Sequence, residues 1–190
     1  TTVRSGGPAS GLYANTSENS TGAGGELQIN AGRLIVQDGA QVNVSNRGTG
    51  SAGNLTIAAD SLRLNNSGSL RAESRAGSQG NITLNVRDIQ MRGGSNITTN
   101  ATGLSEGGNI TIDADTLVAL ENSDITANAV QGRGGNIQIS ISGIFGSQFR
   151  PALTPESDIT ASSQFGISGN VTITNPEVET RSLLVELPQN

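Results

Sequence analysis

The sequence contains no cysteine and no histidine among its 190 residues. The lack of cysteine excludes a disulfide framework and any thiolate metal site. The lack of histidine removes the side chain that most often serves as a general base and as a metal ligand. We therefore expect no metal, no cofactor and no catalytic residues, and we interpret the chain as a non-enzyme.

Aromatic and other hydrophobic residues are also scarce. Aromatic residues make up 2% of the chain and hydrophobic residues 33%, which is below the usual share for a globular domain. Such a chain must either bury small aliphatic residues in a narrow space or remain disordered. The regular placement of its isoleucine, leucine and valine residues, described below, favours the narrow core.

Clustered positive charge and long apolar runs are missing as well. The net charge is −5 and the 11 basic residues are scattered, whereas nucleic-acid binding requires clustered basic residues. No apolar run is long enough to cross a membrane, and the first residues do not form a signal peptide. We expect no nucleic-acid partner and no membrane span, in a secreted protein without its signal or in an internal piece of a longer protein.

What the sequence does contain is a six-residue phrase that occurs six times. It reads GGNITI at residues 107–112, and near-copies begin at residues 24, 52, 79, 134 and 168. Successive copies are therefore 28, 27, 28, 27 and 34 residues apart. A nearly constant spacing in this range indicates a repeat architecture.

Apolar residues keep fixed offsets from the second glycine of each copy. They lie 2, 4, 9, 17 and 19 residues after it, and within each cluster they alternate with polar residues, as in a β-strand. Glycine, asparagine, aspartate and serine, which tolerate tight turns, separate the clusters. The first of these apolar positions holds Leu27, Leu55, Ile82, Ile110, Ile137 and Val171.

These offsets predict three short strands and three turns in each repeat. Each strand pairs with its counterpart in the next repeat, and the crossover rule favours a right-handed path. The predicted fold class is therefore all-β: a right-handed parallel β-helix of about five full coils, with about 27 residues per coil. We assign residues 1–175 to this solenoid.

Two segments depart from the repeat. The fifth repeat is seven residues longer than the others, which predicts an insert at residues 145–156 that bulges from the shaft near one end. Its exposed side chains make Phe145, Phe149 and Arg150 our candidate contacts with a cell surface or a polysaccharide. Residues 176–190 abandon the repeat and are predicted to form a capping tail, because open solenoid ends must be covered.

Polar residues also recur at fixed outward positions. The position after the second glycine holds Glu26, Asn54, Asn81, Asn109, Asn136 and Asn170. Such a row could bind ice or a polysaccharide, but we favour a ladder of amides that hydrogen-bond along the solenoid axis. Glycan-acceptor sequences of the form Asn-x-Thr start at Asn54, Asn81, Asn109 and Asn170, and we attribute them to the repeat itself.

Charged residues raise three chemical alternatives. A calcium site could be formed by Asp60, Asp88, Asp113 and Asp115. A polysaccharide lyase or hydrolase could use Glu73 with Arg71 and Arg75, or Glu156 with Asp158 and Arg150. We favour turn residues and solvated charges in all three cases, because no third supporting group is evident around either carboxylate cluster.

Once the repeats are aligned, the chain resembles the filamentous haemagglutinin-like exoproteins of two-partner secretion, in particular the large cyanobacterial members. The resemblance covers nearly the whole chain and is most specific in GIFGSQFRPALTPESDITASSQFG, residues 143–166. It implies a right-handed β-helix that an outer-membrane transporter partner exports and that is displayed outside the bacterial cell. The Asn-Pro-Asn-type motifs of that family's secretion domain are absent, so the resemblance implies a C-proximal shaft segment with no catalytic residues.

We therefore expect an extracellular, structural and adhesive shaft. One alternative is a carbohydrate- or cell-surface-binding module that uses residues 145–156, and a less favoured one is a polysaccharide-degrading β-helix enzyme. Unpaired strand edges at an open first coil also predict end-to-end self-association.

Overall fold

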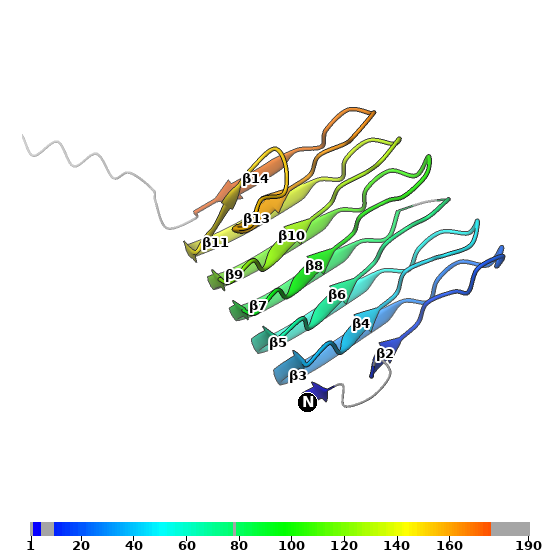
Figure 1. Ribbon diagram of the computed structural model, residues 1–190. Helices are drawn as coiled ribbons and strands as arrows, with labels where there is room; N and C mark the ends of the chain where they lie inside the picture. The colour runs from blue at the N-terminus through cyan, green and yellow to red at the C-terminus, as the bar shows by residue number, and fades with distance from the viewer. Residues whose placement is uncertain (1, 5–9, 78, 176–190) are drawn as a thin grey trace, which may run out of the picture.

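The computed structural model describes residues 2–4, 10–77 and 79–175, and every regular element in these ranges is a β-strand. The strands form two parallel sheets of seven strands each, stacked as a solenoid of about five turns (Figure 1). The predicted parallel β-solenoid is therefore confirmed. No helix in the described ranges is long and apolar enough to span a membrane.

The first sheet consists mainly of long strands that follow one another along the axis. In spatial order they are β1 (Thr2–Arg4), β3 (Leu27–Gln37), β5 (Leu55–Asn65), β7 (Ile82–Met91), β9 (Ile110–Ala119), β11 (Ile137–Phe145) and β14 (Val171–Thr174). Residues at the same repeat position are direct neighbours, so that Leu27 pairs with Leu55 and Leu55 with Ile82. The pairing register is therefore the sequence repeat itself.

The second sheet consists of short strands. In spatial order they are β12 (Ser147–Phe149), β13 (Ser157–Thr160), β10 (Asp124–Thr126), β8 (Asn96–Thr98), β6 (Ser69–Arg71), β4 (Gln41–Asn43) and β2 (Gly11–Tyr13). A row of isolated bridges continues each coil beyond this sheet, through Thr16, Asn46, Ser74, Ala101, Ala129 and Ser163. Every coil is thus bonded to its neighbours on three sides.

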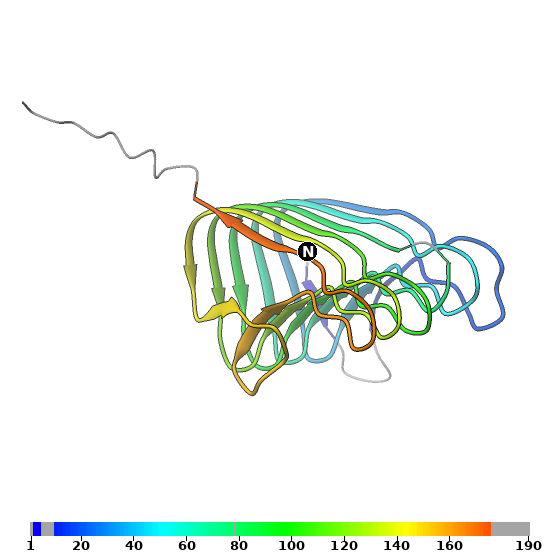
Figure 2. The same ribbon diagram turned by 90° about the horizontal axis from the view of Figure 1, so that it is seen from above.

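The structure refines the prediction of three separate short strands per coil. The first two run together into one long strand, which bends where its pairing is interrupted (Figure 2). In β3, residues 27–31 pair with 55–59 and residues 33–37 with 61–65, whereas Gly32 and Asp60 at the bend are outside the register. The bend lets a single strand line two sides of the coil.

The core is a set of stacked columns, as the offsets predict. Leu34, Leu62 and Ile89 fill one column and are at most 1% exposed. The column at offset 19 holds small residues, and the Thr99 hydroxyl there donates to the Gly108 carbonyl oxygen at 2.8 Å. A buried column at offset 11 was not predicted; its members are Val36, Leu64, Met91 and Ala119.

The turn between the two sheets depends on left-handed backbone conformations. In successive coils the pairs Asp38–Gly39, Asn66–Ser67, Gly93–Gly94 and Glu121–Asn122 all have φ between 47° and 74°. Two consecutive residues with positive φ reverse the chain sharply, and glycine, asparagine and aspartate adopt this conformation at the lowest cost. The predicted turn residues therefore lie at a corner of the coil.

The second glycine of each repeat has a different role. Its φ is not positive, but a Cβ atom at Gly108 would lie 1.7 Å from the Gly80 carbonyl oxygen, and one at Gly135 would lie 1.9 Å from that of Gly108. No side chain fits in that space. Glycine recurs here because adjacent coils bring their backbones into direct contact.

The insert at residues 145–156 changes the end of the second sheet. After Gly146, whose φ is 80°, β12 runs parallel to β13 on the side away from β10. It therefore occupies the position that the short strand of a sixth coil would take. The predicted capping tail, residues 176–190, lies outside the described residues.

Candidate functional site

The outward face of the first sheet carries the asparagine ladder, and its contacts are structural. The Oδ1 atom of Asn81 accepts from the backbone N of Asn109 at 2.9 Å and from its Nδ2 at 3.0 Å. Asn109 accepts from Asn136 in the same two ways, both at 3.1 Å. The interpretation as an axial ladder is confirmed, because these amides bond to one another between coils.

The aspartates considered for calcium do not converge. Asp60 forms an exposed ion pair with Arg87 at 3.1 Å, and Asp88 accepts from the Thr116 hydroxyl at 2.6 Å. Among the described residues, no group of three or more acidic side chains is placed to hold a metal ion.

The outward face of the second sheet is hollowed and polar. Three adjoining hollows of about 370, 630 and 260 Å³ share lining residues, so they form one continuous depression across the short strands and the loops that follow them. We call this depression the polar groove. The residues that line more than one hollow are Arg47, Arg71, Glu73, Arg75, Asn100 and Thr102.

Alternation along the short strands produces this polar lining. Val42 and Val44 point into the core, so the intervening Asn43 and the flanking Gln41 and Ser45 face the other side of the sheet. The positions of Gln41 and Asn43 hold Ser69 and Arg71 in the next coil, and Asn96 and Thr98 in the coil after it. The groove therefore presents hydroxyl and amide groups together with a few charged side chains.

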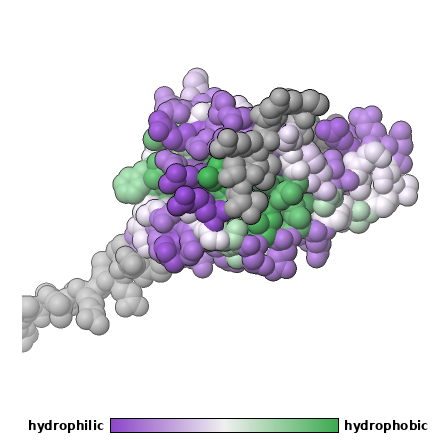
Figure 3. Space-filling view, turned by 90° about the horizontal axis from the view of Figure 1, so that it is seen from below, coloured by the Kyte–Doolittle hydropathy of each residue, from purple (hydrophilic) through white to green (hydrophobic). Residues whose placement is uncertain are grey.

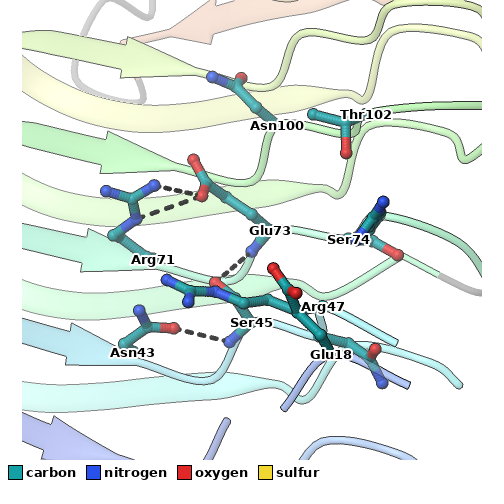
Figure 4. A pocket seen from close by; sticks show the side chains of 11 residues that line it. Glu18, Asn43, Ser45, Arg47, Arg71, Glu73, Ser74, Asn100 and Thr102 are labelled. Atoms are coloured by element: carbon teal, nitrogen blue, oxygen red, sulfur yellow. Dashed lines mark hydrogen bonds and ion pairs between the residues drawn. The ribbon is translucent and has the colours of Figure 1, made fainter. Parts of the chain in front are cut away.

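Glu73 and Arg71 form an ion pair at the centre of the groove (Figure 4). Glu73 Oε2 accepts from both Nε and Nη2 of Arg71, and its Oε1 accepts from the Thr98 hydroxyl at 3.1 Å. The backbone N of Glu73 donates to Ser45 Oγ at 2.9 Å, and this hydrogen bond ties Glu73 to the preceding coil. The sequence cluster of Glu73 and Arg71 is thus brought together, with both carboxylate oxygens already occupied by protein donors.

Arg75, the third member of that sequence cluster, lies at one side of the groove together with Arg47. Both residues line the two larger hollows, and both are exposed. The backbone N of Arg75 donates to the Asn46 carbonyl oxygen at 3.1 Å, so the two arginines follow bonded positions on adjacent coils. Sequence reasoning missed Arg47, although it has the same offset of 22 from its glycine as Arg75.

The other sequence cluster is a clamp for the insert. The Asp158 carboxylate is fully buried and accepts from Nη1 of Arg150, from the backbone N of Thr154 and, at 3.1 Å, from the Thr154 hydroxyl. Burial alone would raise the pKa of Asp158, but these hydrogen bonds outweigh it and lower the pKa. Glu156 is exposed and does not contact this pair through its side chain.

Asp124 occupies the equivalent position in the preceding coil, and its pKa moves the other way. Burial raises the pKa of Asp124 and the negative charge of Asp158 adds to the rise, although its Oδ1 accepts from the Asp158 backbone N at 2.9 Å. The pKa values of the two stacked carboxylates are therefore shifted in opposite directions, because Asp158 accepts hydrogen bonds from the Thr154 backbone, from Arg150 and from the Thr154 hydroxyl, whereas one backbone hydrogen bond lowers the pKa of Asp124.

Two of the three predicted contact residues are exposed, and the third is engaged within the insert. Phe145 and Phe149 are 60% and 56% exposed, whereas the Arg150 guanidinium is directed to Asp158 and to the Ser157 carbonyl oxygen at 3.2 Å. The insert reaches the polar groove through Leu153, which lines its smallest hollow.

Comparisons with known proteins do not assign the chain to a family. No family model, no curated protein and no solved structure matches the chain.

Proposed function

We propose that the chain is a rigid structural and adhesive shaft displayed outside a bacterial cell, without catalytic activity. The observation that carries this proposal is the continuous series of parallel strands in the first sheet, from β3 through β11 to β14, in which equivalent repeat positions pair from coil to coil. Each coil contacts only its neighbours, so length is added without widening the core. Such a rod is suited to hold an adhesive region away from a surface.

The place of action and the export partner rest on the resemblance to two-partner secretion exoproteins. In this proposal an outer-membrane transporter exports the full-length protein, and the solenoid forms outside the cell. Antibodies raised against the purified chain should label intact producing cells, and deletion of the transporter gene should abolish the label. A signal that appears only after cell lysis would contradict the proposal.

End-to-end contact is part of the same proposal. Residues 27–31 of β3 have no neighbouring strand on their outer side in the described part of the chain, since β1 pairs only with residues 35–37. An apolar patch is visible on this end of the molecule (Figure 3), where Leu27 and Ile29 are only partly buried. Unpaired edges of this kind attract another strand, from a second copy or from a preceding coil. Sedimentation at increasing concentration should show association, and a monomer at all concentrations would oppose it.

A second candidate function is polysaccharide binding, and the polar groove favours it. Rows of hydroxyl and amide groups on a long open depression are suited to sugar hydroxyls. In this proposal the contact lies on the short-strand face rather than on the insert alone. Binding to a panel of purified polysaccharides tests this function, whereas an assay for new reducing or unsaturated ends tests the less favoured enzyme alternative.

A further inference from the structure

The two arginines at the side of the polar groove have no carboxylate partner among the residues that the structure describes. Arg47 and Arg75 have neither an ion pair nor a side-chain hydrogen bond within the described ranges. Four other arginines have a carboxylate partner there: Arg71, Arg87, Arg92 and Arg150. The pair therefore differs from the arginines that stabilise this fold.

Their spacing places two like charges on adjacent coils. The backbones at these positions are hydrogen-bonded neighbours on adjacent coils, and neighbouring parallel strands lie about 4.8 Å apart. Two guanidinium groups on one row repel each other unless an anion lies between them. Glu18 lines the first hollow but forms no ion pair with either arginine.

The second hollow gives this pair a distinct setting. It is lined by both arginines and by no acidic residue, on a chain whose net charge is −5. Leu104, which is 83% exposed, lines the same hollow and offers an apolar surface beside the charges. Sugar rings carry both features, because their C–H faces are apolar and their substituents are polar or charged.

We infer that Arg47 and Arg75 form an anion-binding site in the polar groove, and that its ligand is an acidic polysaccharide. The two guanidinium groups bind a carboxylate or sulfate group of one sugar. Thr49, Asn100 and Thr102, which line the groove and are exposed or partly exposed, hydrogen-bond to hydroxyl groups of the adjoining sugars. The groove extends over several coils, which suits an extended chain rather than a single small anion. This inference rests on the proposed polysaccharide-binding function and adds the charge class of the ligand.

The test measures binding of the full chain to polygalacturonate at low salt, by calorimetry or affinity electrophoresis. We expect the double variant Arg47→Gln/Arg75→Gln to bind at least about tenfold more weakly, since charge-assisted hydrogen bonds to the anion are lost. The matched control is Arg63→Gln/Arg133→Gln, which removes the same charge from two exposed arginines that line none of these hollows. The control should bind as the wild type does, with an unchanged far-ultraviolet spectrum in both variants.

Further ligands separate the possible outcomes. A sulfated galactan tests whether the site accepts sulfate as well as carboxylate, and a fully methyl-esterified galacturonan removes the charge while keeping the sugars. Equal binding of the esterified polymer would overturn the anion site but would leave polysaccharide binding by the groove in place. No binding of any polymer would overturn both the anion site and polysaccharide binding by the groove. Equal loss of binding in the two double variants would show that the arginines act only by unspecific charge attraction. Equal binding of single-stranded DNA would show the same.

Discussion

The regular coils and the fifth coil of this solenoid are stabilised in different ways. In the regular coils, like residues stack and bond to like, as Asn81 does to Asn109. In the fifth coil, one buried carboxylate, Asp158, fastens an insert that has no counterpart elsewhere in the repeat. The comparison shows that repetition distributes stability over many equivalent contacts, whereas an interruption depends on a few unique ones.

The largest expected effect comes from the core, where a central coil and the last strand can be compared in one column. Ile112 is 1% exposed and Ile173 is 40% exposed. We expect Ile112→Ala to lower the free energy of unfolding by about 2–5 kcal/mol, since it leaves a cavity between two coils. Ile173→Ala should cost about 1 kcal/mol, because less surface is buried there. Urea unfolding followed by circular dichroism measures both, and equal losses would contradict the difference between central and terminal coils.

The insert clamp should give the next largest effect. Asp158→Ala leaves Arg150 and the Thr154 backbone N without their acceptor, and we expect a loss of about 1–3 kcal/mol. Asp60→Ala is the control, because its ion pair with Arg87 is exposed on both sides and should contribute less than about 1 kcal/mol. Limited proteolysis provides a second measurement: cleavage within residues 147–156 should accelerate only in the Asp158 variant. Unchanged cleavage there would argue against the clamp.

The asparagine ladder should give a smaller effect that depends on position. Asn109→Ala removes one donated and two accepted side-chain hydrogen bonds between coils, for an expected loss of about 1–2 kcal/mol. Within the described residues the Asn170 side chain bonds to Thr172 of its own coil and to no other coil, so Asn170→Ala should cost less than about 0.5 kcal/mol. If the two substitutions cost the same in chemical denaturation, the ladder contributes nothing beyond strand propensity.

The smallest expected effect is a pH dependence with opposite signs for two stacked aspartates. Because the pKa of Asp124 is raised above its usual value of 3.8, its ionised form costs stability at neutral pH. Asp124→Asn should therefore stabilise the protein by less than about 1 kcal/mol at pH 7, and the gain should vanish as the pH falls toward 3.8.

Asp158 should show the opposite behaviour. Its pKa is lowered, so its contribution is complete above 3.8 and is lost as the pH falls through the lower pKa of the folded state. Asp158→Asn should be destabilised at neutral pH, and the difference from the wild type should shrink in acid. Thermal unfolding between neutral and acidic pH tests both variants, and the same sign for the two would refute the assignment.

Much of the fold could be predicted because, in a solenoid, residues that are one repeat apart in the sequence become neighbours on adjacent coils. The apolar offsets 2, 4, 9, 17 and 19 became buried columns, and the interval of 27–28 residues became the pairing register. The role of the second glycine was less visible, because a short distance between the backbones at Gly108 and Gly80 leaves no trace in one sequence beyond the glycine itself.

The candidate site was predictable only in part. The sequence places Arg71 beside Glu73, since residues two apart on a strand point to the same face. The sequence does not show that Arg75 lies outside this ion pair or that Arg47 and Arg75 line the same hollows. Both facts depend on how the loops after the short strands are packed.

The sequence alone therefore determined the parallel solenoid, its core columns and its polar ladders, since each of these follows from a local pattern repeated at constant spacing. The tertiary structure decided the features that break the repeat. It placed β12 on the outer edge of β13 and buried Asp158 beneath the insert. It also left Arg47 and Arg75 at the side of a groove without a carboxylate partner in the described part of the chain. The physical reason is that a constant repeat length fixes which residues become neighbours on adjacent coils. The contacts of an insert or a loop have no such repeat and are fixed only by how the coils pack.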